Sequence, residues 1–192
     1  MIEAQTDRIS DEALISLVKK NHSGAINELI NRHKVMVFNL ALRLLGNFHE
    51  AEEAAQDTFV KAIQSIHEFR ADSQLGTWLY RICFNTCITY KRKKRLNTFS
   101  LSKAKLEEHP TTQLLCALEQ KDNVKYLNQA LSTLSSSDIA IVSLFYMDDL
   151  PTHEIAKVIG ISEGNVRVKL HRARNILKDQ LKKILNNEVL NL

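Results

Sequence analysis

Residues 151–174 read PTHEIAKVIGISEGNVRVKLHRAR, and this stretch decides the fold. Ala156 is small at a point where two helices approach closely, and Gly160 follows where a turn needs a positive φ. Val166 lies six residues beyond Gly160 and would pack a second helix onto the first, while Ser162 is a good N-cap for that helix. The spacing predicts a helix-turn-helix. The small core of the motif is expected to contain Ile155, Ile159 and Ile161.

The second helix of this motif is strongly basic, which predicts contact with DNA. A helix-turn-helix lays its second helix in the major groove, with the first residues of that helix at the base edges. The alternative is an αα-hairpin with a purely structural role, but such a hairpin does not explain the Arg and Lys residues between 167 and 178. The candidate DNA contacts are Glu163, Gly164, Asn165, Arg167, Lys169 and His171, with Arg172 and Arg174 as phosphate contacts.

The rest of the chain also has helical periodicity, and no strand-like alternation occurs. Ser10 is a candidate N-cap, Gly46 a candidate helix end, and 69–76 a candidate loop before a helix capped by Thr77 or a neighbour. The pattern breaks down after residue 95. The sequence therefore predicts an all-α protein of two small helical domains, at 1–95 and 124–192, joined by a flexible linker at 96–123 with one short helix near 114–118.

The composition excludes several classes of protein. The 192 residues are 44% hydrophobic and 25% charged, with only five Gly and two Pro, which excludes disordered and fibrous chains. Aromatic residues make up 6%, and turn residues are too scarce for a β-sandwich or barrel. The longest apolar run, from Ile139 to Met147, is far below the roughly 18 residues of a membrane span, and no secretory leader is expected. We expect no membrane insertion and a cytoplasmic location.

The net charge of +4 hides two positive segments and one negative segment. Residues 80–95 hold six basic residues and no acid, and residues 152–183 hold eight basic residues and three acids. Residues 50–57 hold four acids and no base. Two separate basic segments on helices indicate a polyanion contacted twice, for which DNA is the leading candidate. The alternative is that each segment is an ordinary solvated helix face.

Aromatic residues interleave with the bases of the first positive segment. Such an arrangement suits single-stranded DNA, because an unstacked base needs a flat surface and its phosphate needs a cation. Trp78 lies at helical spacing from Ile82 and is expected in the core, whereas Phe84 and Tyr90 are open to either interpretation. The loop at 69–74 offers polar groups that could form a pocket for one base.

Two segments resemble a known family. The segment from Ala41 to Arg95, which contains GTWLYRICFNTCITYKRKKR, is similar to region 2 of bacterial sigma factors, and Leu134 to Leu181 is similar to region 4. The resemblance is strongest to the small extracytoplasmic-function (ECF) class, which keeps only these two regions. It implies a factor that binds core RNA polymerase and promoter DNA, recognises the −35 and −10 elements and assists DNA melting. It also implies control by a separate anti-sigma protein.

The resemblance implies roles for individual residues as well. The acidic helix would dock on polymerase through Glu52, Glu53, Gln56, Asp57 and Phe59. The loop before WLYRI would capture a flipped base of the −10 element, with Phe69, Arg70, Asp72 and Ser73 among its contacts. The helix after it would read and melt the −10 region through Asn85, Thr86, Thr89, Tyr90, Arg92 and Lys93. Asn165 and Val168 stand where relatives often carry Thr and Ser, which leaves the preferred promoter sequence open.

Two other functions fit the sequence less well. An enzyme is disfavoured because the His residues are scattered and no Gly-rich phosphate loop exists, so neither a catalytic residue nor a cofactor is expected. Cys83 and Cys87 could ligate a metal at i, i+4, but core thiols are the preferred interpretation. A redox role for these two or for Cys116 stays a minor alternative. A stand-alone regulator would have to dimerise and bind duplex DNA tightly by itself.

Overall fold

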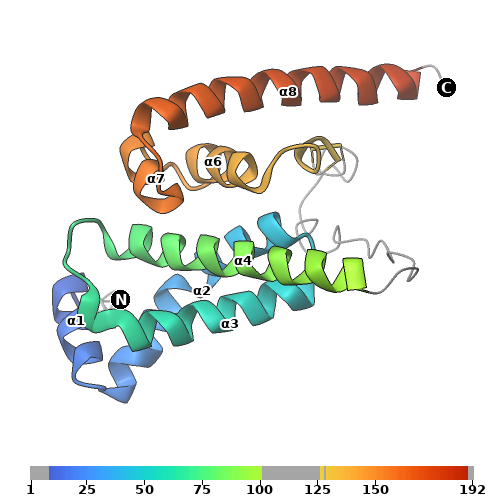
Figure 1. Cartoon of the computed structure of the whole chain (residues 1–192). Helices are drawn as coiled ribbons and strands as arrows, with labels where there is room; N and C mark the ends of the chain where they lie inside the picture. Colours follow the sequence, from blue (N-terminus) through green and yellow to red (C-terminus); the bar gives the residue numbers. More distant parts are fainter. Residues whose placement is uncertain (1–8, 101–125, 128, 190–192) are drawn as a thin grey trace, which may run out of the picture.

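The computed structural model describes residues 9–100, 126–127 and 129–189, and these residues form helices and no strand. The all-α prediction is confirmed. The helices are α1 (Asp11–Lys19), α2 (Ser23–Leu45), α3 (Phe48–Ser65), the short 3₁₀ helix η1 (Ile66–Glu68), α4 (Leu75–Ser100), α6 (Ser136–Tyr146), α7 (Thr152–Ile159) and α8 (Glu163–Val189). Figure 1 shows α1 to α4 packed as one bundle, with α6 and α7 lying over α4 and α8 outermost.

Local capping groups set several helix ends. The Ala13 N–H donates to Ser10 Oγ at 3.3 Å, so the predicted cap of α1 is confirmed. The Glu50 N–H donates to Asn47 Oδ1 at 3.0 Å at the start of α3. Gly46 ends α2 with φ +70°, a left-handed conformation that glycine adopts without steric cost.

Helix α4 is longer than the sequence pattern predicts at both ends. It begins at Leu75 rather than Thr77, and the Trp78 N–H donates to the Gln74 carbonyl at 3.1 Å. It continues to Ser100, past residue 96 where the linker was expected to begin, because the Lys and Arg residues of its second half are good helix formers. The expected helix at 114–118 and Cys116 lie outside the described residues.

The first four helices bury a common apolar core. Leu14, Leu29, Leu40 and Leu79 are fully buried, one from each of α1 and α4 and two from α2. Cys83 and Cys87 lie inside this core as free thiols, and Cys83 Sγ is 3.5 Å from the Val37 carbonyl oxygen. The neighbouring Cys87 thiol and burial raise the pKa of Cys83 well above its usual range. Both cysteines are therefore core residues, as predicted, and Cys83 stays a protonated thiol.

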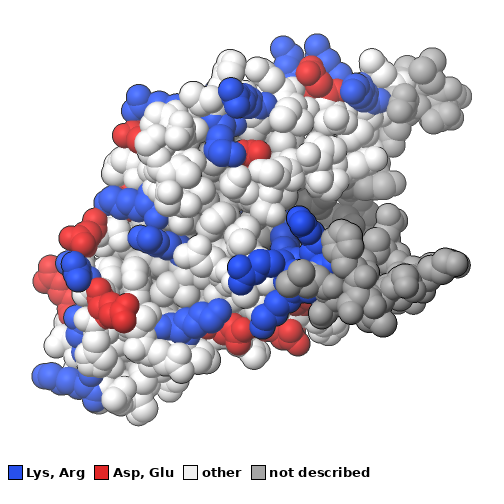
Figure 2. All heavy atoms as spheres, in the orientation of Figure 1, with Lys and Arg blue, Asp and Glu red and all other residues white. Residues whose placement is uncertain are grey.

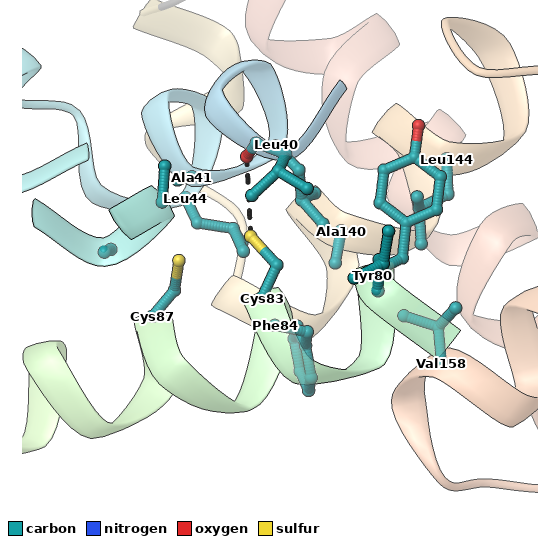
Figure 3. Close-up of a cluster of buried hydrophobic side chains, with 14 of the residues drawn as sticks. Leu40, Ala41, Leu44, Tyr80, Cys83, Phe84, Cys87, Ala140, Leu144 and Val158 are labelled. Atoms are coloured by element: carbon teal, nitrogen blue, oxygen red, sulfur yellow. Dashed lines mark hydrogen bonds between the residues drawn. The ribbon is translucent and has the colours of Figure 1, made fainter. Parts of the chain in front are cut away.

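The same core continues from α4 into the second helical domain. Figure 3 shows Tyr80 of α4 beside Ala140 and Leu144 of α6 and Val158 of α7, with Leu40 and Leu44 of α2 on the other side. Phe84 is also buried, with 7% of its surface exposed. The sequence leaves the roles of Phe84 and Tyr90 open, and the structure shows that Phe84 belongs to the core. The two predicted domains thus share one apolar cluster in this structure.

Polar contacts across this junction accompany the apolar ones. Arg43 Nη1 of α2 lies 2.9 Å from Asp148 Oδ2, just beyond α6, and each side chain is only 13% exposed. Burial, and next the charge of Asp148 nearby, raise the pKa of the Tyr80 hydroxyl. At the far end of the junction, Lys91 Nζ donates to Ser136 Oγ at 2.9 Å. The Arg43–Asp148 pair is the charged contact that neutralises a buried guanidinium between the domains.

The substitution Asp148→Asn should loosen the junction, because it removes the counter-charge of Arg43 while keeping the shape of the side chain. A buried charge left without its partner costs roughly 1.5–3 kcal/mol. We expect a lower denaturation midpoint, measured with urea, and a larger radius of gyration in small-angle X-ray scattering.

The matched control is Asp149→Asn, which removes the same charge at the next residue. Asp149 is exposed and has φ +50°, a conformation that asparagine tolerates. Equal effects of the two substitutions on the midpoint and on the radius would contradict a specific role for the Arg43–Asp148 pair.

Candidate functional site

Helices α7 and α8 form the predicted helix-turn-helix. Gly160 ends α7 with φ +78°, and its N–H donates to the Ala156 carbonyl at 2.9 Å. Val166 is fully buried between the two helices. The Asn165 N–H donates to Ser162 Oγ at 3.3 Å, which confirms Ser162 as the cap of α8. Each of these positions has the place that the residue spacing predicts.

The first turns of α8 present most of the candidate DNA contacts to solvent. The exposed ones are Gly164, Asn165, Arg167, His171, Arg172 and Arg174. Lys169 is different, because its Nζ lies 2.9 Å from Asp138 Oδ1 and 3.2 Å from Ser137 Oγ at the start of α6. Its charge is therefore directed toward α6, away from the other candidates.

Glu163, the first residue of α8, is held by two donors. Thr152 Oγ1 donates to Glu163 Oε1 at 2.6 Å, and Arg167 Nη2 lies 2.6 Å from the same oxygen. The hydrogen bond from Thr152, followed by that from Arg167, lowers the pKa of Glu163. Nothing in the sequence pattern points to Thr152, because its partner is 11 residues away across the turn.

The predicted docking residues of α3 share one exposed face. Glu52, Glu53, Gln56 and Asp57 are exposed, at the i, i+1, i+4 and i+5 spacing that places side chains on one side of a helix. Phe59 is separated from them, because it is only 6% exposed and packs into the bundle beneath. Figure 2 shows acidic side chains at the lower edge of the molecule, beside basic side chains.

Hydrogen bonds connect this acidic face with the basic second half of α4. Tyr90 Oη donates to Asp57 Oδ2 at 2.9 Å, and Lys94 Nζ lies 2.6 Å from Glu50 Oε1. Burial and the hydrogen bond to Asp57 raise the pKa of Tyr90 to about 12. The sequence pattern predicts an acidic and a basic helix as separate sites, whereas the structure places them side by side.

The candidate −10 contacts of α4 differ in their exposure to solvent. Asn85, Arg92 and Lys93 are exposed and free to meet a ligand. Thr86 is 1% exposed and accepts a hydrogen bond from Lys61 Nζ at 3.0 Å, so it links α4 to α3 instead. Thr89 donates to the Asn85 carbonyl at 2.9 Å and is half-buried.

The loop before α4 borders an open cavity of about 320 Å³. The ring of Phe69 lies 5.2 Å from that of Trp78, centroid to centroid, and forms one wall. Ala71 has φ +60°, which turns the loop around the cavity. From α7, Lys157 Nζ donates to the Asp72 carbonyl at 2.8 Å. The cavity is lined by Glu68, Phe69, Arg70, Asp72, Ser73, Thr77, Trp78, Arg81 and Lys157.

Aromatic and polar side chains both line this cavity. Trp78 packs against the core, as expected, but its partly exposed side also forms part of the wall. Phe69 is 8% exposed, so it supports the pocket rather than projecting from the loop. Arg70, Asp72 and Ser73 add polar groups at the rim. Lys157 is a lining residue from the second domain, which sequence spacing alone does not place here.

The described residues contain neither a cluster of metal-ligating side chains nor a helix suited to span a membrane. No group of three His, Cys, Asp or Glu side chains there is arranged to hold a metal ion. None of the helices in the same residues combines the length and the apolar character needed to cross a membrane.

Comparison with known proteins follows the same division of the chain. The family model described as Sigma-70 region 2 matches residues 29–96, and the one described as Sigma-70, region 4 matches residues 125–177. The ECF RNA polymerase sigma factor SigW of Bacillus subtilis (strain 168) is 30% identical over 177 residues, with 88% of this chain and 95% of SigW covered. The RNA polymerase sigma factor YlaC of the same organism is 31% identical, with 87% and 98% covered.

Two solved structures have a fold similar to that of this chain. CnrH in complex with the cytosolic domain of CnrY matches with a TM-score of 0.67 at 22% identity, covering 90% of this chain and 97% of CnrH. The sigma factor RpoE of Bartonella quintana, in complex with the anti-sigma factor NepR, matches with a TM-score of 0.64 at 24% identity, covering 80% and 94%. Together with the two region models and the identity to SigW, the shared fold shows that the chain belongs to the extracytoplasmic-function sigma factors of the sigma-70 family, which direct promoter-specific transcription initiation.

Proposed function

We propose that three surfaces of this sigma factor divide the work of initiation. The exposed acids of α3 dock on core RNA polymerase, the 69–74 loop with α4 opens the −10 element, and the first turns of α8 read the −35 duplex. The observation that carries this division is the separation of charge along the described chain. Acids gather on one face of α3, and bases gather on α4 and α8.

The docking surface is proposed as Glu52, Glu53, Gln56 and Asp57, with Phe59 as the buried support beneath it. Exposed carboxylates on a rigid helix suit a basic protein partner, because complementary charges steer association and fix orientation. Asp57 also accepts the hydrogen bond of Tyr90, so the docking face and α4 form one rigid unit.

The −10 surface is proposed as the cavity behind the loop together with the exposed residues of α4. An unstacked base would enter beside the Phe69 and Trp78 rings, and Arg70, Asp72 and Ser73 would contact its polar edge. Asn85, Arg92 and Lys93 would follow the strand along α4, where Arg92 and Lys93 neutralise phosphates. Tyr90 stands between these residues and the acidic face, while Thr86 and Thr89 stabilise the helix that carries them.

The −35 surface is proposed as the exposed residues from Glu163 to Arg174. Asn165 and Arg167 lie in the first turns of α8, where a recognition helix meets base edges. His171 and Gly164 share the exposed side of the helix, and Arg172 and Arg174 would contact phosphates. Lys169 would support this surface indirectly, because its ion pair with Asp138 connects α8 to α6.

The proposed function also includes the domain division, the location and the partner of the chain. We divide the chain into a domain at 1–95, a linker at 96–123, whose first residues continue α4 to Ser100, and a domain at 124–192. We propose that the chain acts in the cytoplasm, without a cofactor and without catalysing a reaction by itself. A protein of the anti-sigma class is the proposed regulatory partner, because RpoE of similar fold was solved with the anti-sigma factor NepR.

The double substitution Glu52→Gln and Glu53→Gln should weaken assembly with core polymerase. It removes two carboxylates from the docking face and leaves the buried residues of α3 untouched. We expect an affinity roughly tenfold lower, which corresponds to about 1.4 kcal/mol, measured by fluorescence titration of labelled protein with sigma-free core enzyme.

A matched control is Glu12→Gln with Asp179→Asn, which removes two exposed acids outside α3. Its affinity for core enzyme should equal that of the unchanged chain. If both double variants bind equally well, the acids of α3 do not form the docking surface.

The double substitution Arg92→Ala and Lys93→Ala should slow the opening of promoter DNA by the holoenzyme. Both side chains are exposed, so their loss removes phosphate contacts without opening the core. We expect weaker permanganate reactivity of thymines in the −10 region and fewer transcripts from a duplex template.

A template with a pre-opened −10 bubble is the control, because it removes the need for melting. Transcription from that template should recover substantially with the same variant. If the variant loses transcripts equally from the duplex and from the bubble template, the substitution affects a step other than DNA opening.

A further inference from the structure

The first residue of α7 and the first residue of α8 are joined across the turn of the helix-turn-helix. Thr152 Oγ1 donates to Glu163 Oε1 at 2.6 Å, and Arg167 Nη2 lies 2.6 Å from the same oxygen. The result is a relay of three side chains. It begins outside the recognition helix and ends at an arginine in its second turn.

Arg167 is distinct from the other exposed arginines of this surface. Its guanidinium is held through Nη2, although the side chain is 69% exposed. Arg172 and Arg174 make no hydrogen bond or ion pair with any described residue. Unrestrained arginines suit phosphates, which can be met from many directions, whereas a restrained one suits a base edge, where the direction of the N–H groups decides the contact.

The ion pair alone would restrain Arg167 poorly. Exposed pairs between long side chains gain little free energy, because water screens the charges and ordering the side chains costs entropy. Glu163 is itself 38% exposed and could adopt other rotamers. The hydroxyl of the half-buried Thr152 supplies a second donor from a different helix, and this donor keeps the carboxylate in one orientation.

We propose that Thr152 is a specificity-determining positioning residue, which through Glu163 aims Arg167 at a guanine of the −35 element. With Nη2 held by the carboxylate, the plane of the guanidinium is restrained, so that one free edge of Arg167 can present two parallel N–H groups to guanine O6 and N7. Thr152 touches no base in this scheme. The inference rests on the proposed reading of the −35 duplex by α8.

The experiment selects promoter DNA from a library with a randomised −35 element, using the full chain assembled with core polymerase. Sequencing of the bound fraction gives the base preference at each position. Four chains are compared with the unchanged protein: Arg167→Ala, Glu163→Gln, Thr152→Val, which keeps the shape and removes the hydroxyl, and Thr152→Ser, which restores the hydroxyl.

We expect Arg167→Ala to abolish the preference for guanine at one position. Thr152→Val and Glu163→Gln should reduce the preference at that same position by roughly threefold to tenfold and leave the other positions unchanged. Thr152→Ser should retain the original preference. The salt dependence of binding should be the same for Thr152→Val as for the unchanged chain, because the phosphate contacts stay intact.

Three outcomes would overturn the inference, and they can be told apart. If Arg167→Ala leaves every preference unchanged, Arg167 reads no base and the proposed reading itself fails at this residue. If Arg167→Ala alters the base preference at one position but Thr152→Val does not, Arg167 reads a base and Thr152 does not position it. If Thr152→Val weakens binding equally at all positions, or if Thr152→Ser behaves like Thr152→Val, Thr152 has only a structural role.

Discussion

Burial of α4 on two opposite sides is the constraint on which the rest of this structure depends. One side of the helix packs on α2 and α3, and the other side packs on α7, where Tyr80 also lies beside Ala140 and Leu144 of α6. The apolar side of α4 therefore belongs to both domains, and the exposed residues of the helix include Arg81, Asn85 and the bases of its second half. The cavity at the loop, the exposed bases of α4 and the position of α7 all follow from the way in which this one helix is enclosed.

At the edges of this core, some charged and polar side chains contact partners that are distant in sequence. Arg43 meets Asp148 across 105 positions, and Tyr90 meets Asp57 across 33. Contacts of this kind add modest stability, but they determine which faces stay free. Lys169 is drawn toward α6 by Asp138, while Arg172 keeps its charge exposed for a polyanion.

Much of the candidate site could be predicted because sigma regions 2 and 4 contain local sequence patterns. The turn at Gly160, the cap at Ser162 and the buried Val166 depend on neighbours within one or two helical turns. Burial was harder to predict. Phe59 and Thr86 were expected at interfaces, yet both lie inside the bundle, because the side of a helix that faces the core depends on how neighbouring helices pack around it.

The amino-acid sequence by itself determined the all-α class, most helix ends, the helix-turn-helix and the charge of each surface, because these properties arise from periodicity, caps and composition along a short stretch of chain. Only the tertiary structure decided that the domains share a core, that Lys157 lines the cavity of the 69–74 loop, and that Thr152 holds Glu163. Each of these contacts joins segments separated by a turn, a helix or a domain. Their geometry depends on packing that no local pattern encodes.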